Sequence, residues 1–96
     1  MHTIVGIHYS GHRAIFRPVT AKKSTLKLLG EEIRSRRIAR GLSQDAVAAK
    51  SGLHRNYIGM VERGERNISI LSLETITKTL GVSMTEIIAV VEQRQA

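Results

Sequence analysis

The stretch from Leu42 to Asn67 constrains the fold of this 96-residue chain more than any other. Ser43 stands where a helix N-cap belongs. Leu42, just before it, and Val47, four residues after it, have the spacing of a hydrophobic staple. Gly52 can take the left-handed conformation that ends a helix at little cost. A second helix is predicted from His54 to Arg63, so the stretch indicates two short helices joined by a tight turn.

The second of these helices has two distinct faces. Ile58 and Val61 are three residues apart and point to one side. The residues on or near the opposite side are small or polar: Arg55, Asn56, Gly59, Met60 and Arg63. Such a helix, braced by another across a Gly turn, is typical of a DNA-reading helix-turn-helix. Gly59 costs about 1 kcal/mol relative to Ala inside a helix, which either a close approach of DNA or tolerance at an exposed site would explain.

A set of residues at characteristic places supports a family assignment. They are Gln44 near the start of the first helix, Ala48 facing the second helix, Gly52 in the turn, Ile58 and Val61 in the core, and Glu62-Arg63-Gly64 at the end. With these residues the stretch resembles the helix-turn-helix of the phage repressor and Cro family (Xre-like), over about Leu29 to Ile88. The runs Leu53–Ile58 and Val61–Ser69 are similar to the controller proteins of restriction-modification systems.

The resemblance implies a compact all-α domain of five helices that binds double-stranded DNA sequence-specifically as a dimer and regulates transcription. Its second motif helix would enter the major groove. The residues expected to read base edges are Arg55, Asn56 and Met60. Those expected to contact the DNA backbone are Ser43, Gln44, His54, Tyr57, Arg63, Arg66 and Asn67.

Two further positions are interpreted through the same resemblance. In the family, an Arg at the place of Arg37 often pairs with a Glu at the end of the second motif helix, the reading helix, and here that Glu is Glu62. Such a pair would orient the helices rather than stabilise them. His54 stands where the family usually has Ser or Thr. A poor cap with an exposed ring is favoured there over a pH-dependent contact with phosphate or a base edge.

The other helices follow from periodicity and capping. A first helix is predicted from about Leu26 to Arg40, and a fourth from Ile70 to Leu80 after an N-cap at Ser69. The buried face of the fourth helix is expected to comprise Ile70, Leu73, Ile76 and Leu80. Ser83 and Glu86 form a capping box at the start of the fifth helix.

Five consecutive apolar residues, Ile87 to Val91, cover more than one face of the fifth helix. The choice is between a wide stripe buried in the core and a surface for a second copy of the chain. Dimerisation is favoured, because it fits the recognition of paired half-sites, and the interface is expected at Ile87, Ile88 and Val91.

Residues 1–24 form an N-terminal extension outside the resemblance, before a domain at 25–96. Thr3–Tyr9 and Arg13–Val19 are rich in β-branched and aromatic residues, and Ser10-Gly11-His12 could turn a hairpin. A hairpin, a loose basic arm and a segment that binds a partner protein all remain open, with the basic arm slightly favoured. His8 and His12 lack a third ligand, so no metal site is predicted.

Charge and composition narrow the class of function. A net charge of +7 favours a polyanionic partner, and only three aromatic residues argue against binding of single strands by base stacking. The chain has no cysteine and no membrane-spanning or signal-peptide pattern, so we expect a cytoplasmic protein. Without a carboxylate pair, a nucleophile with its base or a Gly-rich phosphate loop, neither an enzyme nor a cofactor is expected. The main rival function is an antitoxin-type module that binds a partner protein through the N-terminal extension.

Overall fold

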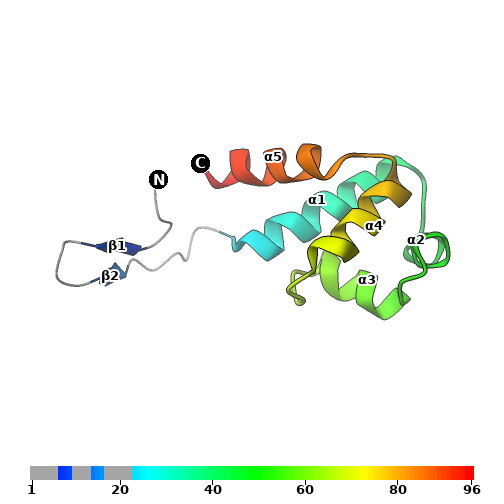
Figure 1. Cartoon of the computed structure of the whole chain (residues 1–96), viewed down its shortest axis with the longest axis horizontal. Coiled ribbons are helices and arrows are strands. Elements are labelled where there is room, and N and C mark those ends of the chain that lie inside the picture. The colour runs from blue at the N-terminus through cyan, green and yellow to red at the C-terminus, as the bar shows by residue number, and fades with distance from the viewer. Residues whose placement is uncertain (1–6, 10–13, 17–22) are drawn as a thin grey trace.

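The computed structural model describes residues 7–9, 14–16 and 23–96. Five helices follow one another from residue 25 onward: α1 (Thr25–Ala39), α2 (Gln44–Ser51), α3 (Arg55–Glu62), α4 (Ile70–Leu80) and α5 (Met84–Gln95) (Figure 1). The expected all-α fold of five helices is therefore confirmed. The first and third helices differ from the predicted bounds by one residue at each end, and the fourth has the predicted bounds.

Two short strands precede the helices. β1 (Ile7–Tyr9) and β2 (Ala14–Phe16) pair antiparallel, with Ile7 opposite Phe16 and Tyr9 opposite Ala14. The turn predicted at residues 10–12, which includes His12, and the arm cations Arg13, Arg17 and Lys22 lie outside the described residues.

Serine caps define most of the helix starts. Ser24, Ser43, Ser69 and Ser83 each accept a hydrogen bond from the backbone N–H three residues ahead, and the Ser83–Glu86 capping box has both of its bonds. His54 at the start of α3 makes no such bond, as the interpretation of a poor cap anticipates. Gly52 has a φ of 77° and ends α2, which turns the chain directly into α3.

The helices pack around one apolar core, in which α1 contacts both α3 and α5. The crossing of α1 and α3 is close at Gly30. A Cβ placed there would lie 2.5 Å from the Glu62 carbonyl oxygen and would also run into the carbonyl oxygen of Val61. Absence of a side chain at Gly30 thus sets how deeply α3 sits against α1.

The burial pattern corrects two expectations. Ile70 is 65% exposed, because it occupies the first turn of α4 and points away from the core that Leu73, Ile76 and Leu80 enter. Ile87 and Val91, at 0% and 2% exposure, are buried inside their own domain, so their assignment to a dimer interface is wrong. Ile88, on the other side of α5, remains at the surface.

Two features are absent from residues 7–9, 14–16 and 23–96. None of the helices there has the length and apolar character to cross a membrane. No three His, Cys, Asp or Glu side chains come together in that part of the chain as a metal site would require.

Candidate nucleic-acid interface

The outer face of α3 brings the three expected base-reading residues together. Arg55 and Asn56 are exposed in its first turn, and Met60 lies half-buried one turn further on. These three side chains, with Gln44, Gly59 and Arg63, line one hollow on the surface. The arrangement presents donors from a helix start, the part of a reading helix that reaches base edges.

Gly59 occupies the middle of this hollow and is buried. A Cβ there would lie 3.1 Å from Arg63 Nη1 and 3.8 Å from Gln44 Oε1. The idea that Gly59 is tolerated at an exposed site is therefore wrong, because two long polar side chains lie over it. A close approach of DNA at this point stays a prediction.

Behind the outer face, Arg37 and Glu62 form the pair implied by the family resemblance. Arg37 Nε donates to Glu62 Oε2 at 2.6 Å, and Nη2 donates to Glu62 Oε1 at 3.0 Å. Arg37 Nη1 also donates to the backbone oxygen of Leu42 at 2.9 Å. Hydrogen bonding to the Glu62 carboxylate raises the pKa of Arg37 above its ordinary value, although burial opposes the rise. The pair ties α1 to α3 and to the loop before α2.

Gln44 completes this cluster from the first residue of α2. Its Nε2 donates to Glu62 Oε1 at 3.0 Å, so the side chain expected to touch phosphate is held by a buried carboxylate. Ser43, the neighbouring candidate, accepts from the backbone N–H of Ala46 at 3.0 Å as the cap of α2. Hydrogen bonds thus fix both side chains at the edge of the reading surface, which is the outer face of α3 with its candidate base-reading residues.

A second hollow lies where α3 and α4 begin. It is lined by four of the expected DNA-backbone contacts, His54, Tyr57, Arg66 and Asn67, together with Gly52, Leu53, Ser69 and Ser72. The guanidinium carbon of Arg66 lies 5.3 Å from the centre of the Tyr57 ring, at the distance of a cation–π contact. The loop 63–69 therefore holds the Arg66 guanidinium beside the first half of α3.

Two exposed ion pairs border the reading surface. Arg63 Nε lies 3.1 Å from Glu65 Oε2, and Arg55 Nε lies 3.0 Å from Asp45 Oδ1. Sequence reasoning missed Asp45, although an acid in the first turn of a helix after a Ser cap is a visible signal. It also missed Lys27, whose Nζ donates to the Arg63 carbonyl oxygen at 3.1 Å and so closes the C-terminal end of α3.

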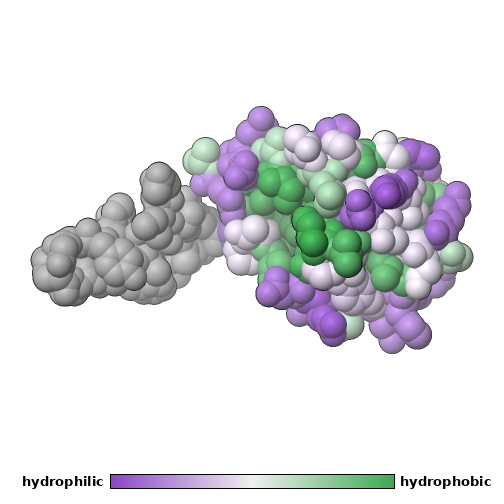
Figure 2. Space-filling view, viewed as in Figure 1, coloured by the Kyte–Doolittle hydropathy of each residue, from purple (hydrophilic) through white to green (hydrophobic). Residues whose placement is uncertain are grey.

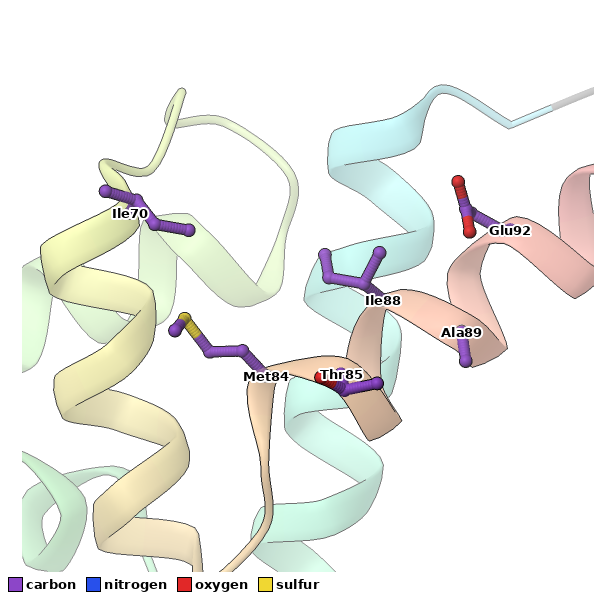
Figure 3. Close-up of a pocket in the computed structure, with 6 residues that line it drawn as sticks. All are labelled: Ile70, Met84, Thr85, Ile88, Ala89 and Glu92. Carbon is purple, nitrogen blue, oxygen red and sulfur yellow. The ribbon is translucent and has the colours of Figure 1, made fainter. Parts of the chain in front are cut away.

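An apolar hollow lies between the starts of α4 and α5, bordered by Ile70, Met84, Thr85, Ile88, Ala89 and Glu92 (Figure 3). The side chains of Ile70, Met84 and Ile88 come from two helices and border one common space. Leu71, beside Ile70, is also exposed. Figure 2 shows hydrophobic side chains gathered in a band on one face of the helical domain. Of the predicted interface residues, Ile88 alone belongs to this hollow.

The sequence is similar to a known family model and to known control proteins. The family model HTH_3, described as Helix-turn-helix, matches residues 33–87, more than half of the chain. The control protein C.SmaI of Serratia marcescens is 44% identical over 62 residues, which cover 65% of this chain and 74% of that protein. The part matched by the family model includes α3 and both members of the Arg37–Glu62 pair.

Solved structures extend the likeness to three dimensions. The restriction-modification controller protein C.AhdI from Aeromonas hydrophila superposes with a TM-score of 0.63 and 40% identity, covering 65% of this chain and 94% of that chain. The controller protein C.Esp1396I, solved as a tetramer in complex with its natural 35 base-pair operator, gives a TM-score of 0.68 and 34% identity over 76% of this chain and 96% of that chain.

Proposed function

This chain belongs to the helix-turn-helix family, and from that membership we propose that it is a transcriptional regulator that binds an operator in double-stranded DNA as a homodimer. The observation that carries the proposal is the outer face of α3. Arg55, Asn56 and Met60 stand there on a helix whose inner face is fixed by the Arg37–Glu62 pair. The operator complex of C.Esp1396I supports the same mode of binding.

In the proposed complex α3 enters the major groove, and each of the two hollows contacts a different part of the DNA. The hollow around Gly59 faces the base edges, where Arg55 can donate two hydrogen bonds to guanine O6 and N7. The hollow around Tyr57 and Arg66 meets the DNA backbone, with Asn67 as a further donor. The base-edge contacts select the sequence, and the backbone contacts position the protein on the duplex.

The second copy of the chain is proposed to cover the apolar hollow between α4 and α5. Ile70, Leu71 and Ile88 form an exposed apolar group of the kind that marks an interface. A two-fold pairing through this surface presents two copies of α3 to two half-sites of an operator. The relatives C.SmaI and C.AhdI are control proteins, so the antitoxin-type rival is not favoured.

Salt dependence tests the DNA-binding proposal. The logarithm of the affinity for duplex DNA should fall linearly with the logarithm of salt concentration, and Arg66→Ala should reduce that slope by about 1 for random and preferred duplexes alike. Lys78→Ala is a matched control, because Lys78 is an exposed cation on α4 that lines neither hollow. Binding that does not respond to salt would contradict the proposal.

Site selection from a random duplex pool tests the assignment of the base reader. The preferred sequence of Arg55→Ala should lose its guanine at one symmetric pair of positions, because a bidentate contact discriminates by about 1–3 kcal/mol. Affinity for random DNA should change little. Identical preferences for wild type and variant would remove Arg55 from the reading surface.

Sedimentation tests the interface. Ile88→Asp places a charge in the apolar hollow and should convert a dimer to a monomer with its helical content retained. Ile38→Asp makes the same change at an exposed position on α1 outside the hollow and should leave the dimer intact. A wild-type monomer at tens of micromolar, or equal effects of the two changes, would refute this use of the hollow.

A further inference from the structure

Asp45 is an acidic residue at the edge of a surface proposed to meet phosphates. It lies in the first turn of α2, beside the Ser43 cap and Gln44, and its side chain is exposed. A carboxylate in this place is repelled by a polyanion, so its presence calls for a physical reason. The reason suggested by the geometry is its contact with Arg55, the candidate base reader of the proposed function.

The contact engages one particular part of the guanidinium. Asp45 Oδ1 lies 3.0 Å from Arg55 Nε, the nitrogen nearest the main chain. The contact is an ion pair and not a hydrogen bond, and within residues 23–96 neither terminal nitrogen of Arg55 has a hydrogen-bond acceptor. The four N–H groups of those two nitrogens are therefore the ones left to donate outward, and they form the fork that fits guanine O6 and N7.

Stability does not account for this pair. Both side chains are mostly exposed, and exposed ion pairs of this kind contribute little to folding. Asp45 can also favour α2 through the helix dipole, but that effect needs only a negative charge and no contact with Arg55. The direction of the Arg55 side chain is what the contact itself determines.

We propose that Asp45 is a positioning residue for sequence recognition, holding Arg55 by Nε so that both terminal nitrogens face the base edges. Where the base is not guanine, the guanidinium stays with Asp45 instead of turning to a neighbouring phosphate. Asp45 thereby lowers affinity for every duplex through its charge and raises the discrimination between duplexes. This inference rests on the proposed function and adds a residue of α2 to the specificity of α3.

The test compares affinities for two duplexes, the sequence selected by wild type from a random pool and the same sequence with the Arg55-dependent guanines replaced. We expect wild type to prefer the first by roughly 5- to 150-fold. Asp45→Ala should reduce that ratio several-fold and increase affinity for random DNA. Asp45→Glu, which keeps the negative charge beside Arg55, should retain more of the ratio than Asp45→Asn, which removes the charge and keeps the shape.

Two controls separate positioning from other effects. Glu65→Ala removes the acid paired with Arg63, a candidate backbone contact, and should raise affinity for both duplexes without changing their ratio. In an Arg55→Ala background, Asp45→Ala should leave the ratio where Arg55→Ala alone puts it. Melting curves establish that each variant is folded.

The outcomes are distinct. A ratio unchanged by Asp45→Ala in a folded protein would overturn the role of Asp45, even though wild type still binds DNA. A ratio that falls equally in the Arg55→Ala background would show that Asp45 acts without Arg55 and would also overturn it. Failure of wild type to select any sequence, or to respond to salt, would instead refute the proposed function.

Discussion

Two arginine–carboxylate pairs lie on opposite sides of α3, and they differ in nearly every physical respect. Arg37 and Glu62 have side chains only 11% and 2% exposed and share two hydrogen bonds, with Gln44 as a further donor. Arg55 and Asp45 are 57% and 77% exposed and share a single contact of 3.0 Å. The first pair lies behind α3 and the second lies in front of it.

The difference teaches which of the two pairs the fold depends on. A buried charge that loses its partner has no water to replace it, so the pair behind α3 keeps its geometry. An exposed guanidinium that loses its carboxylate is solvated by water at little cost. The motif thus combines a buried pair on which the fold depends with an exposed pair that the fold can lose, and the predictions at Arg37 and Arg55 challenge that division.

The largest expected effect is at the buried pair. Arg37→Ala leaves the Glu62 carboxylate buried without its cation and should lower the free energy of unfolding by about 3 kcal/mol. For a domain of this size the melting temperature should fall by roughly 10–20 °C. Thermal unfolding followed by circular dichroism measures it.

A double replacement sharpens the result. Arg37→Met with Glu62→Leu removes both charges and should recover much of the lost stability, because the unpaired charge is the main cost. If Arg37→Ala alone costs no more than an exposed pair does, the distinction between the two pairs fails.

The next effect compares two glycines in the middle of helices. Gly30→Ala drives a Cβ into the backbone carbonyl oxygens of Val61 and Glu62 and should cost about 1–3 kcal/mol, because backbone cannot easily give way. Gly59→Ala meets only the flexible end of Arg63, at 3.1 Å, and should be within about 1 kcal/mol of wild type, helped by the helix propensity of Ala. Urea unfolding of both variants decides it, and equal costs would show that the α1–α3 crossing is not tight.

Local signals in the sequence predicted much of this fold. Serine caps and terminal glycines are effects within one turn, so the bounds of α4 and the capping box of α5 could be read directly. The reading helix was recognisable because Ile58 and Val61 alternate with polar residues at helical spacing. The Arg37–Glu62 pair came from the family resemblance, since the two residues lie 25 positions apart.

Other features depend on tertiary packing and could not be read from spacing. A run of five apolar residues in α5 does not say which of them meet α1, and the structure buries Ile87 and Val91 while exposing Ile88. Ile70 has helical spacing from Leu73, but it is the first residue of α4 and stays 65% exposed within the described domain while Leu73 is buried. The contact of Asp45 with Arg55 requires the angle between α2 and α3, which the turn at Gly52 sets.

A smaller effect concerns an exposed acid that joins α1 to α5. Glu31 lies between Lys23 and Arg94, at 2.6 and 3.0 Å, and the hydrogen bond from Lys23, then that from Arg94, lowers its pKa despite some burial. Because the pKa is lowered on folding, this contribution is present above the ordinary range of a glutamate and is lost as pH falls through the lowered value. Glu31→Gln should cost under about 1 kcal/mol at neutral pH and nothing in acid. Stability measured against pH checks it, and a difference that persists in acid would contradict the ionic origin.

The smallest expected effect on stability is at the exposed pair itself. Arg55→Ala leaves Asp45 in contact with water, so no charge is stranded, and Asp45 keeps its favourable place at the N-terminal end of α2. The free energy of unfolding should therefore change by less than about 0.5 kcal/mol, a shift of a few degrees at most in melting temperature. The same variant is expected to lose a base preference, so stability and recognition should separate at this residue and coincide at Arg37. Melting of Arg55→Ala beside Arg37→Ala, in the same buffer, measures the contrast directly. A loss of stability at Arg55 comparable to that at Arg37 would mean that the pair in front of α3 supports the fold as the pair behind it does.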